Sequence, residues 1–190
     1  MLKCISILEV SQYIFPRFLR FLMVQKYLPF FVVFFLVGFI TVLFLSLGSA
    51  QNMVVIKEGN TEKKPLDIVL HKYQDSDCGM VIDTLEYASQ VISPTGKTYF
   101  FHDHGGFVQW LEDKPFKDEA VIWVMSKDTK KWIDAKEAFF SLRDETPMGY
   151  GFGAYEKIQE GFIDFDTMRL KMLRGETLNN PAIRKKLLGI

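Results

Sequence analysis

The feature that most limits what this chain can form is a long apolar run near its N-terminus. No charged residue occurs from Tyr27 to Ile56, and the stretch from Leu28 to Leu47 consists mostly of Phe, Val, Leu and Ile. Coiled as a helix, about twenty residues rise about 30 Å, which is the thickness of the hydrocarbon layer of a bilayer. We therefore predict that residues 27–50 form a transmembrane anchor or a signal peptide.

The residues that precede this run predict its orientation. Arg17, Arg20 and Lys26 lie close before it, and positive charge at this position is retained on the cytoplasmic side. Residues 1–26 are then a cytoplasmic N-terminal extension. Everything after Ala50 is expected on the periplasmic side of the cytoplasmic membrane.

Two features leave the processing of the N-terminus open. Gly48 and Ala50 are small residues of the kind that a signal peptidase reads, so cleavage after Ala50 would release the rest into the periplasm. Met23 offers a second start with a short basic segment before the apolar run. We expect either an uncleaved anchor or this cleavage, and both predict an exported domain.

The exported part has nearly balanced charge. The first fifty residues hold four of the 23 basic and one of the 23 acidic side chains, so residues 51–190 carry 19 basic and 22 acidic groups. A net charge of −3 offers no broad basic field and excludes nucleic acid as an expected partner. Cys4 and Cys78 are the two cysteines and lie on opposite sides of the apolar run, which predicts no intrachain disulfide.

The exported part divides into a tether and one domain. Residues 51–66 lack hydrophobic periodicity and are predicted to be a tether, followed by a domain over 67–190 that is long enough to bury one core. The predicted elements are, in order, strands 85–92 and 97–102, a helix capped by Asp103 through Glu112, strands 120–126 and 131–133, a helix capped by Asp134 through Arg143, strands 146–155 and 161–165, and helices 166–174 and 181–188. Two successive strand-strand-helix units predict an α+β fold.

Cys78 and Met80 form a candidate site for a soft metal ion. They are separated by one glycine, which can bend the backbone so that the two sulfur atoms converge. Cu(I) prefers thiolate and thioether ligands and accepts imidazole. The residues able to complete such a site are His71, His102, His104 and Met148.

Ordinary and alternative interpretations stand beside this one. A lone cysteine is more often a small buried side chain, and a methionine more often fills a gap in a core, so the chain is alternatively a membrane-tethered docking module without metal. Cys78 and His102 are conceivable as a nucleophile and its base. A closed zinc site, a dithiol redox site and a phosphate-binding loop lack their required residues.

Several motifs in the same order resemble the NosL family, the nitrous-oxide reductase accessory proteins. They cover about Asp75 to Asp166. The motifs are Asp77-Cys78-Gly79-Met80-Val81-Ile82, Tyr87-Ala88-Ser89-Gln90-Val91, Gly96-Lys97, Phe101-His102-Asp103, Trp110-Leu111, Trp132-Ile133-Asp134-Ala135 with Ala138 and Phe139, Pro147-Met148-Gly149-Tyr150-Gly151 with Ala154-Tyr155, and the stretch 161–165.

The resemblance implies a copper chaperone rather than an enzyme. Such a protein binds one Cu(I) outside the membrane and supplies nitrous-oxide reductase, docking to an ABC-type maturation complex. It implies a fold of two related β-β-α-β units. The family's copper residues correspond to Cys78 and Met80, and Met148 corresponds to a recurrent Met-Gly.

Two departures from the family pattern matter for the site and for the anchor. Many members are lipoproteins, whereas here the apolar run takes the anchoring role. Where the family often has Phe-Asp-Asp, this chain has His102-Asp103-His104. We therefore expect His102 or His104 to supply a nitrogen ligand.

Overall fold

The computed structural model describes residues 27–46 and 53–189, and the chain divides into two compact units, Met1–Gln51 and Asn52–Ile190. The predicted apolar helix is confirmed. It spans Tyr27–Ser46, has a mean hydropathy of 2.8, and is long and apolar enough to cross a membrane by length and composition. The predicted N-terminal extension, the start at Met23 and the cleavage site at 48–50 lie outside the described residues.

The second unit is built on a five-stranded antiparallel sheet in the order β1-β3-β2-β4-β5. The strands are β1 (Ile56–Lys57), β2 (Ser89–Ile92), β3 (Thr98–Phe101), β4 (Val121–Met125) and β5 (Trp132–Asp134). The hairpin of β2 and β3 is confirmed, and its turn contains Gly96 at φ +81°, a conformation that glycine adopts without steric cost.

Each face of this sheet carries its own apolar core. Side chains alternate between the two faces of a strand. Phe101 accordingly joins a large cluster with Phe107 and Phe165, whereas the adjacent Phe100 joins a smaller cluster with Tyr73 and Ile82. The smaller core is closed by the segment that precedes β2, which is the segment that holds Cys78.

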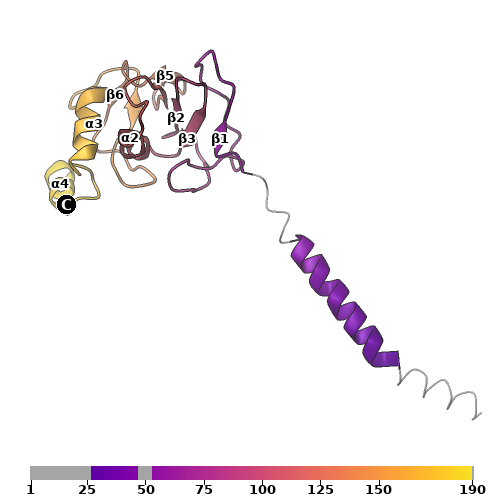
Figure 1. Cartoon of the computed structure of the whole chain (residues 1–190). Coiled ribbons are helices and arrows are strands. Elements are labelled where there is room, and N and C mark those ends of the chain that lie inside the picture. The colour runs from indigo at the N-terminus through magenta and orange to yellow at the C-terminus, as the bar shows by residue number, and fades with distance from the viewer. Residues whose placement is uncertain (1–26, 47–52, 190) are drawn as a thin grey trace, which may run out of the picture. The chain divides into compact units, whose positions relative to one another are not determined.

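Three helices follow the expected positions: α2 (His104–Glu112), α3 (Phe165–Leu173) and α4 (Pro181–Leu188). Asp103 caps α2, as predicted, by accepting a hydrogen bond from the Gly105 backbone N–H. The stacked rings of Phe107 and Phe165 pack α2 against α3. In Figure 1, α3 and α4 lie at the end of the domain opposite to β1. The α+β class is confirmed.

The helix predicted over 134–143 was wrong. A turn follows β5, and the short strand β6 (Phe139–Phe140) then pairs with β7 (Ala154–Tyr155) in a separate two-stranded sheet. Ala135 and Ala138 are buried as expected of an apolar face. Their spacing suits a turn as well as a helix, and two adjacent phenylalanines favour a strand.

The strands predicted over 146–155 and 161–165 form only in small part. Gly149 and Gly151 have φ of +71° and +95°, so the chain bends there, and only Ala154–Tyr155 is a strand. Ile163 makes an isolated bridge to Phe140. The second repeat therefore has no helix directly after its two strands.

The described part of the predicted tether belongs to the domain. Ile56 and Lys57 pair with β3, and the buried Asn60 side chain donates to the Thr98 hydroxyl at 3.0 Å. The backbone carbonyl of Lys63 accepts a hydrogen bond from the Trp123 indole. Hydrogen bonds from isolated residues to a sheet have no periodic sequence signature, which is why composition alone indicated a tether.

Candidate metal centre

The segment from Asp75 to Met80 is a tight loop between two paired residues. Gln74 and Val81 form an antiparallel bridge, and the Asp75 N–H donates to the Met80 carbonyl at 2.8 Å. At the tip, Gly79 has φ +73°, so the glycine between the two sulfur residues supplies the bend that the sequence predicted. Cys78 and Met80 are both exposed on this loop.

The buried carboxylate of Asp75 shapes the loop from inside. Its Oδ1 accepts hydrogen bonds from the backbone N–H groups of Asp77 at 2.9 Å and Cys78 at 3.1 Å. An aspartate that binds the backbone two and three residues ahead stabilises a turn. The position of Cys78 is thus fixed by a side chain three residues before it.

The same carboxylate also holds His102, which directly follows β3. Oδ2 of Asp75 accepts from the His102 backbone N–H at 2.9 Å and contacts the ring Nδ1 at 2.6 Å. Both side chains are buried. Since a carboxylate accepts, Nδ1 carries the proton, and the neutral ring then has an acceptor lone pair on Nε2.

The charges of this pair support each other. Burial by itself would raise the pKa of the Asp75 carboxyl, but the hydrogen bonds from His102 and the loop outweigh burial and lower that pKa. Burial likewise lowers the pKa of the His102 imidazole, yet the hydrogen bond and charge of Asp75 outweigh it and raise the pKa. The contact therefore favours ionised Asp75 and a proton on His102 Nδ1.

Cys78, His102 and Asp75 offer a group of potential metal ligands. Their ligand atoms lie within 4.8 Å of one another, and the Cys78 Sγ is 3.9 Å from His102 Nδ1. His102 Nε2 is buried and has no hydrogen-bond partner within the described residues. Histidines that bind metals commonly donate their other ring N–H to a carboxylate, which is the relation of His102 to Asp75.

The thiol is not activated in this structure for nucleophilic attack. Burial raises the pKa of the Cys78 thiol, and the negative charges of Asp75 and Asp77 raise it further. A reactive cysteine needs a lowered pKa. The surroundings of Cys78 therefore oppose the thiol-enzyme interpretation, whereas a metal ion that binds the sulfur displaces the thiol proton directly.

His104 is placed away from this loop. It is completely buried, its Nδ1 lies 2.7 Å from the Ser89 hydroxyl, and its ring packs edge-on against Tyr87 and Phe140. Burial lowers its pKa to about 3. The structure thus brings His102 to Cys78 and places His104 in the core, so a ligand role for His104 stays a prediction.

Met148 lies close in the fold to His102 through its backbone. Its N–H donates to the Asp103 carboxylate at 2.9 Å, and Asp103 directly follows His102. The side chain of Met148 is partly buried. Its role as a sulfur ligand also stays a prediction. The third candidate histidine, His71, is exposed and lies in the turn before Tyr73.

Sequence reasoning missed two residues of the site. Asp75 was read only as the start of the matching region, because nothing in a sequence shows that a carboxylate will be buried. Tyr150 packs its ring on Gly105, and burial together with the nearby charges of Asp103, Asp77 and Cys78 raises its pKa. Gly105, a glycine in the first turn of α2, was the one sequence signal that another segment packs closely against the helix here.

Comparison with known proteins found similarity among solved structures alone, and at a low level. No family model matches the chain, and no curated protein matches it. Among solved structures it is similar to the crystal structure of the copper chaperone NosL from Shewanella denitrificans, with 15% identity and a TM-score of 0.44, covering 57% of this chain and 87% of that chain. A likeness at this level carries no information on ligands, so function rests on the site.

Proposed function

We propose that this chain binds Cu(I) through Cys78 and Met80, with His102 as the nitrogen ligand, and hands the ion on outside the cytoplasmic membrane. The observation that carries the proposal is the exposed Cys78 thiol beside the His102 imidazole, whose Nδ1 donates to the buried Asp75 carboxylate and whose Nε2 keeps an acceptor lone pair. Thiolate, thioether and imidazole are the donors that Cu(I) favours. Asp75 already accepts four hydrogen bonds, so it orients these donors instead of binding the ion.

The exposure of the loop suits transfer of the ion. Binding forms the Cys78 Sγ–Cu bond and releases the thiol proton to solvent, with no change in oxidation state. Cu(I) tolerates two or three ligands, so an incoming thiolate or thioether of a partner can bind before Cys78 leaves. Met80 has 43% of its surface exposed and can exchange without unfolding the loop.

The resemblance of the ordered motifs supports a more specific proposal. By that resemblance the recipient is nitrous-oxide reductase, reached through its ABC-type maturation complex, and the chain is a membrane-associated member of the NosL family. Another extracytoplasmic copper enzyme is the alternative client. Met148 is proposed as a further donor on the same basis. His104, which departs from the family pattern and is buried in the core, is the alternative nitrogen donor to His102.

A Cu(I) competition experiment tests the proposal. The full chain in detergent, kept reduced, competes with a chromogenic Cu(I) chelator, and the wild type is compared with Cys78→Ser, Met80→Leu and His102→Ala. Loss of an outer-shell residue typically lowers metal affinity by about 10- to 100-fold. Loss of a direct ligand is expected to lower the Cu(I) affinity by more than this. Met172→Leu, in the core of α3, is the matched control and should bind as the wild type does.

The outcomes separate the candidate functions. Weaker binding confined to the loop and His102 variants supports copper binding at this site. Equal affinity of the wild type and Cys78→Ser would overturn it. Absence of binding by every protein would favour the docking module without metal.

A further inference from the structure

The exposed apolar side chains of the domain are unevenly distributed. Of nine large hydrophobic residues that are exposed in residues 53–189, six lie between Val55 and Val81. We use "loop surface" for five of them, which come from three chain segments: Val55, Val69, Leu70, Met80 and Val81. Scattered single apolar residues are ordinary, but a group at one place indicates a contact surface.

Backbone pairing brings the three segments of the loop surface together. Val54 pairs with Tyr73, and Gln74 pairs with Val81. Because Tyr73 and Ile82 are buried in the smaller core, the neighbouring side chains along each segment point outward. The side chains of Val55 and Val81 therefore flank Gln74 on the outer side. The turn with Val69 and Leu70 is joined to them by the hydrogen bond from His71 N–H to the Ile82 carbonyl.

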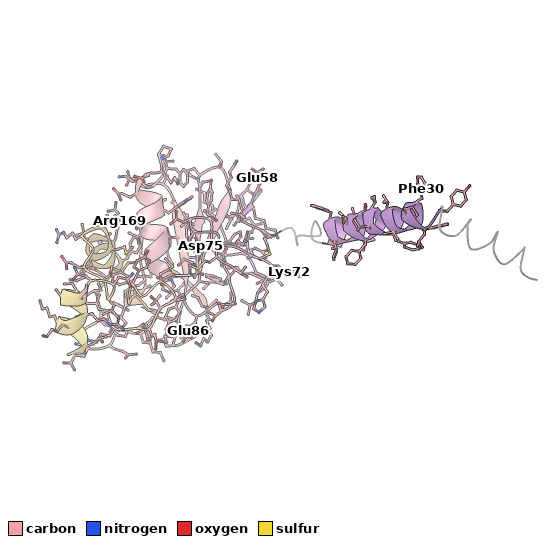
Figure 2. All side chains as sticks on the ribbon, turned by 90° about the horizontal axis from the view of Figure 1, so that it is seen from below. Phe30, Glu58, Lys72, Asp75, Glu86 and Arg169 are labelled. Carbon is pink, nitrogen blue, oxygen red and sulfur yellow. The ribbon has the colours of Figure 1, made fainter. Side chains whose placement is uncertain are left out.

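The loop surface lies where the chain begins the domain. Figure 2 shows Glu58 and Lys72 at one side of the domain and Arg169 at the other side. Val54, the first residue that pairs, donates its N–H to the Lys72 carbonyl at 2.9 Å. The loop surface and the Cys78–Met80 loop thus both lie at the N-terminal end of the domain.

The length of the connecting chain restricts what can cover this end. Seven residues separate Ser46, the last of the apolar helix, from Val54, and they reach at most about 28 Å when fully extended. A domain of this length has a radius of gyration of about 14 Å, or a width of about 37 Å. If the helix spans a bilayer, the connection is too short to pass around the domain and place Val54 on the side away from the lipid.

We propose that the loop surface docks on the lipid bilayer and holds the Cys78–Met80 loop at the membrane surface. The inference rests on the proposed membrane location of the chain. Valine, leucine and methionine side chains enter the boundary between headgroups and acyl chains, where exposed Lys57 and Lys72 can reach the phosphates. Exposed Asp77 and Asp83 oppose strong binding to anionic lipid, so the contact depends on the short connection to the anchor.

Quenching of tryptophan by brominated lipid tests the contact. The full chain is reconstituted into phosphatidylcholine–phosphatidylglycerol vesicles whose acyl chains carry bromine near the headgroup end. Val81→Trp places a probe on the loop surface. Leu170→Trp on α3 is the matched control, since Leu170 is 47% exposed and Val81 is 42% exposed. The fluorescence of the native tryptophans is measured on the wild type and subtracted.

Bromination is expected to lower the fluorescence of the probe at position 81 by about half and to leave the probe at 170 unchanged, since side chains of a docked surface lie about 5–10 Å into the boundary region. Equal quenching at the two positions, or none at 81, would overturn the proposal. The Cu(I) competition, repeated on Val81→Trp in the same vesicles, separates the two proposals. Copper binding without quenching would refute docking alone, and quenching without copper binding would refute the proposed function alone.

Discussion

At the scale of single residues, the Asp75 carboxylate connects the Cys78–Met80 loop to His102. It accepts hydrogen bonds from three backbone N–H groups and from the His102 ring. One buried side chain thereby sets the position of Cys78 and the proton position on its neighbouring imidazole. In the proposed copper site, Asp75 acts on the ion through its ligands.

Replacing Asp75 by Asn tests this role. An amide offers one acceptor oxygen in place of two and presents N–H groups to donors, so we expect the variant to lose about 2–4 kcal/mol of unfolding free energy. Cu(I) affinity should fall by about 10- to 100-fold. Urea unfolding and chelator competition measure the two effects. Asp77→Asn, which changes an exposed carboxylate in the same loop, is the control, and equal effects of both substitutions would refute the role.

His104 predicts a loss of stability in acid. Its folded pKa of about 3 lies below its ordinary value of 6.5 because the ring is buried. Between these pH values the unfolded chain binds a proton that the folded chain does not. The part of the unfolding free energy that depends on neutral His104 is therefore fully present above pH 6.5. It falls, by up to about 1.4 kcal/mol per pH unit, as the pH drops toward 3.

The variant His104→Asn keeps a side-chain amide near Ser89 but does not titrate. Urea unfolding at several pH values should show that the wild type loses stability in acid more steeply than the variant does. A constant difference in unfolding free energy between the two proteins across this pH range would contradict a buried neutral His104.

The sequence predicted part of the site at this scale. Cys78 and His102, which the structure brings together, could be named from the donor chemistry of their residue types, whereas the ligand role of Met80 stays a prediction. The separation of His102 from His104 could not be derived in this way. The two are neighbours in a short motif, and only the end of β3 and the cap of α2 decide that one faces Asp75 and the other the core.

At the scale of elements, the first turn of α2 contains two glycines in different surroundings. A Cβ on Gly105 would lie 2.4 Å from a ring carbon of Tyr150, whereas a Cβ on Gly106 would meet nothing within 4 Å. We expect Gly106→Ala to stabilise the domain by about 0.5–1 kcal/mol through helix propensity. Gly105→Ala should destabilise it by about 1–3 kcal/mol, because Tyr150 must move.

Thermal or urea unfolding of the two variants measures this difference, and each serves as the control for the other. Displacement of Tyr150 should also increase its exposure, which its fluorescence or NMR signals report. Stabilisation by both substitutions would show that the contact between α2 and the Tyr150 loop is loose.

Sequence patterns were sufficient to predict those elements that depend on neighbouring residues in the chain. The hairpin of β2 and β3 and the cap of α2 depend on neighbours in the chain, and both were predicted. The segment after Asp134 depends on distant partners. Phe140 bonds to Ile163, and the backbone N–H of Ser141 bonds to the Gly153 carbonyl. A helix-like spacing of alanines did not reveal this pairing, because a strand and a turn can bury the same residues.

At the scale of the whole molecule, membrane anchoring and copper binding belong to one arrangement in our proposals. If the apolar helix spans a bilayer, the docking proposed above holds the N-terminal end of the domain, with its Cys78–Met80 loop, at the lipid surface. A partner that gives or receives copper would then meet this chain at the membrane surface. This arrangement restricts exchange to partners that reach the same plane.

Binding of Cu(I) should stabilise the whole folded domain. An ion that binds the folded state alone at a free concentration one hundred times its dissociation constant adds about 2.7 kcal/mol. For a domain of this size that corresponds to an increase in Tm of at most about 10 °C. The increase will be smaller than this, because the unfolded chain keeps the Cys78 thiol and can still bind copper through it. An increase remains, because the unfolded chain does not bring Met80 and His102 to the same ion.

Calorimetry of the reduced full chain in detergent, with Cu(I) buffered by a chelator, measures this shift. Met172→Leu should show the same increase as the wild type, and Cys78→Ser should show none. An increase that persists in Cys78→Ser would place the ion elsewhere in the chain. No increase in the wild type would mean that copper does not distinguish the folded from the unfolded state, and a preformed site of three converging donors would then be excluded.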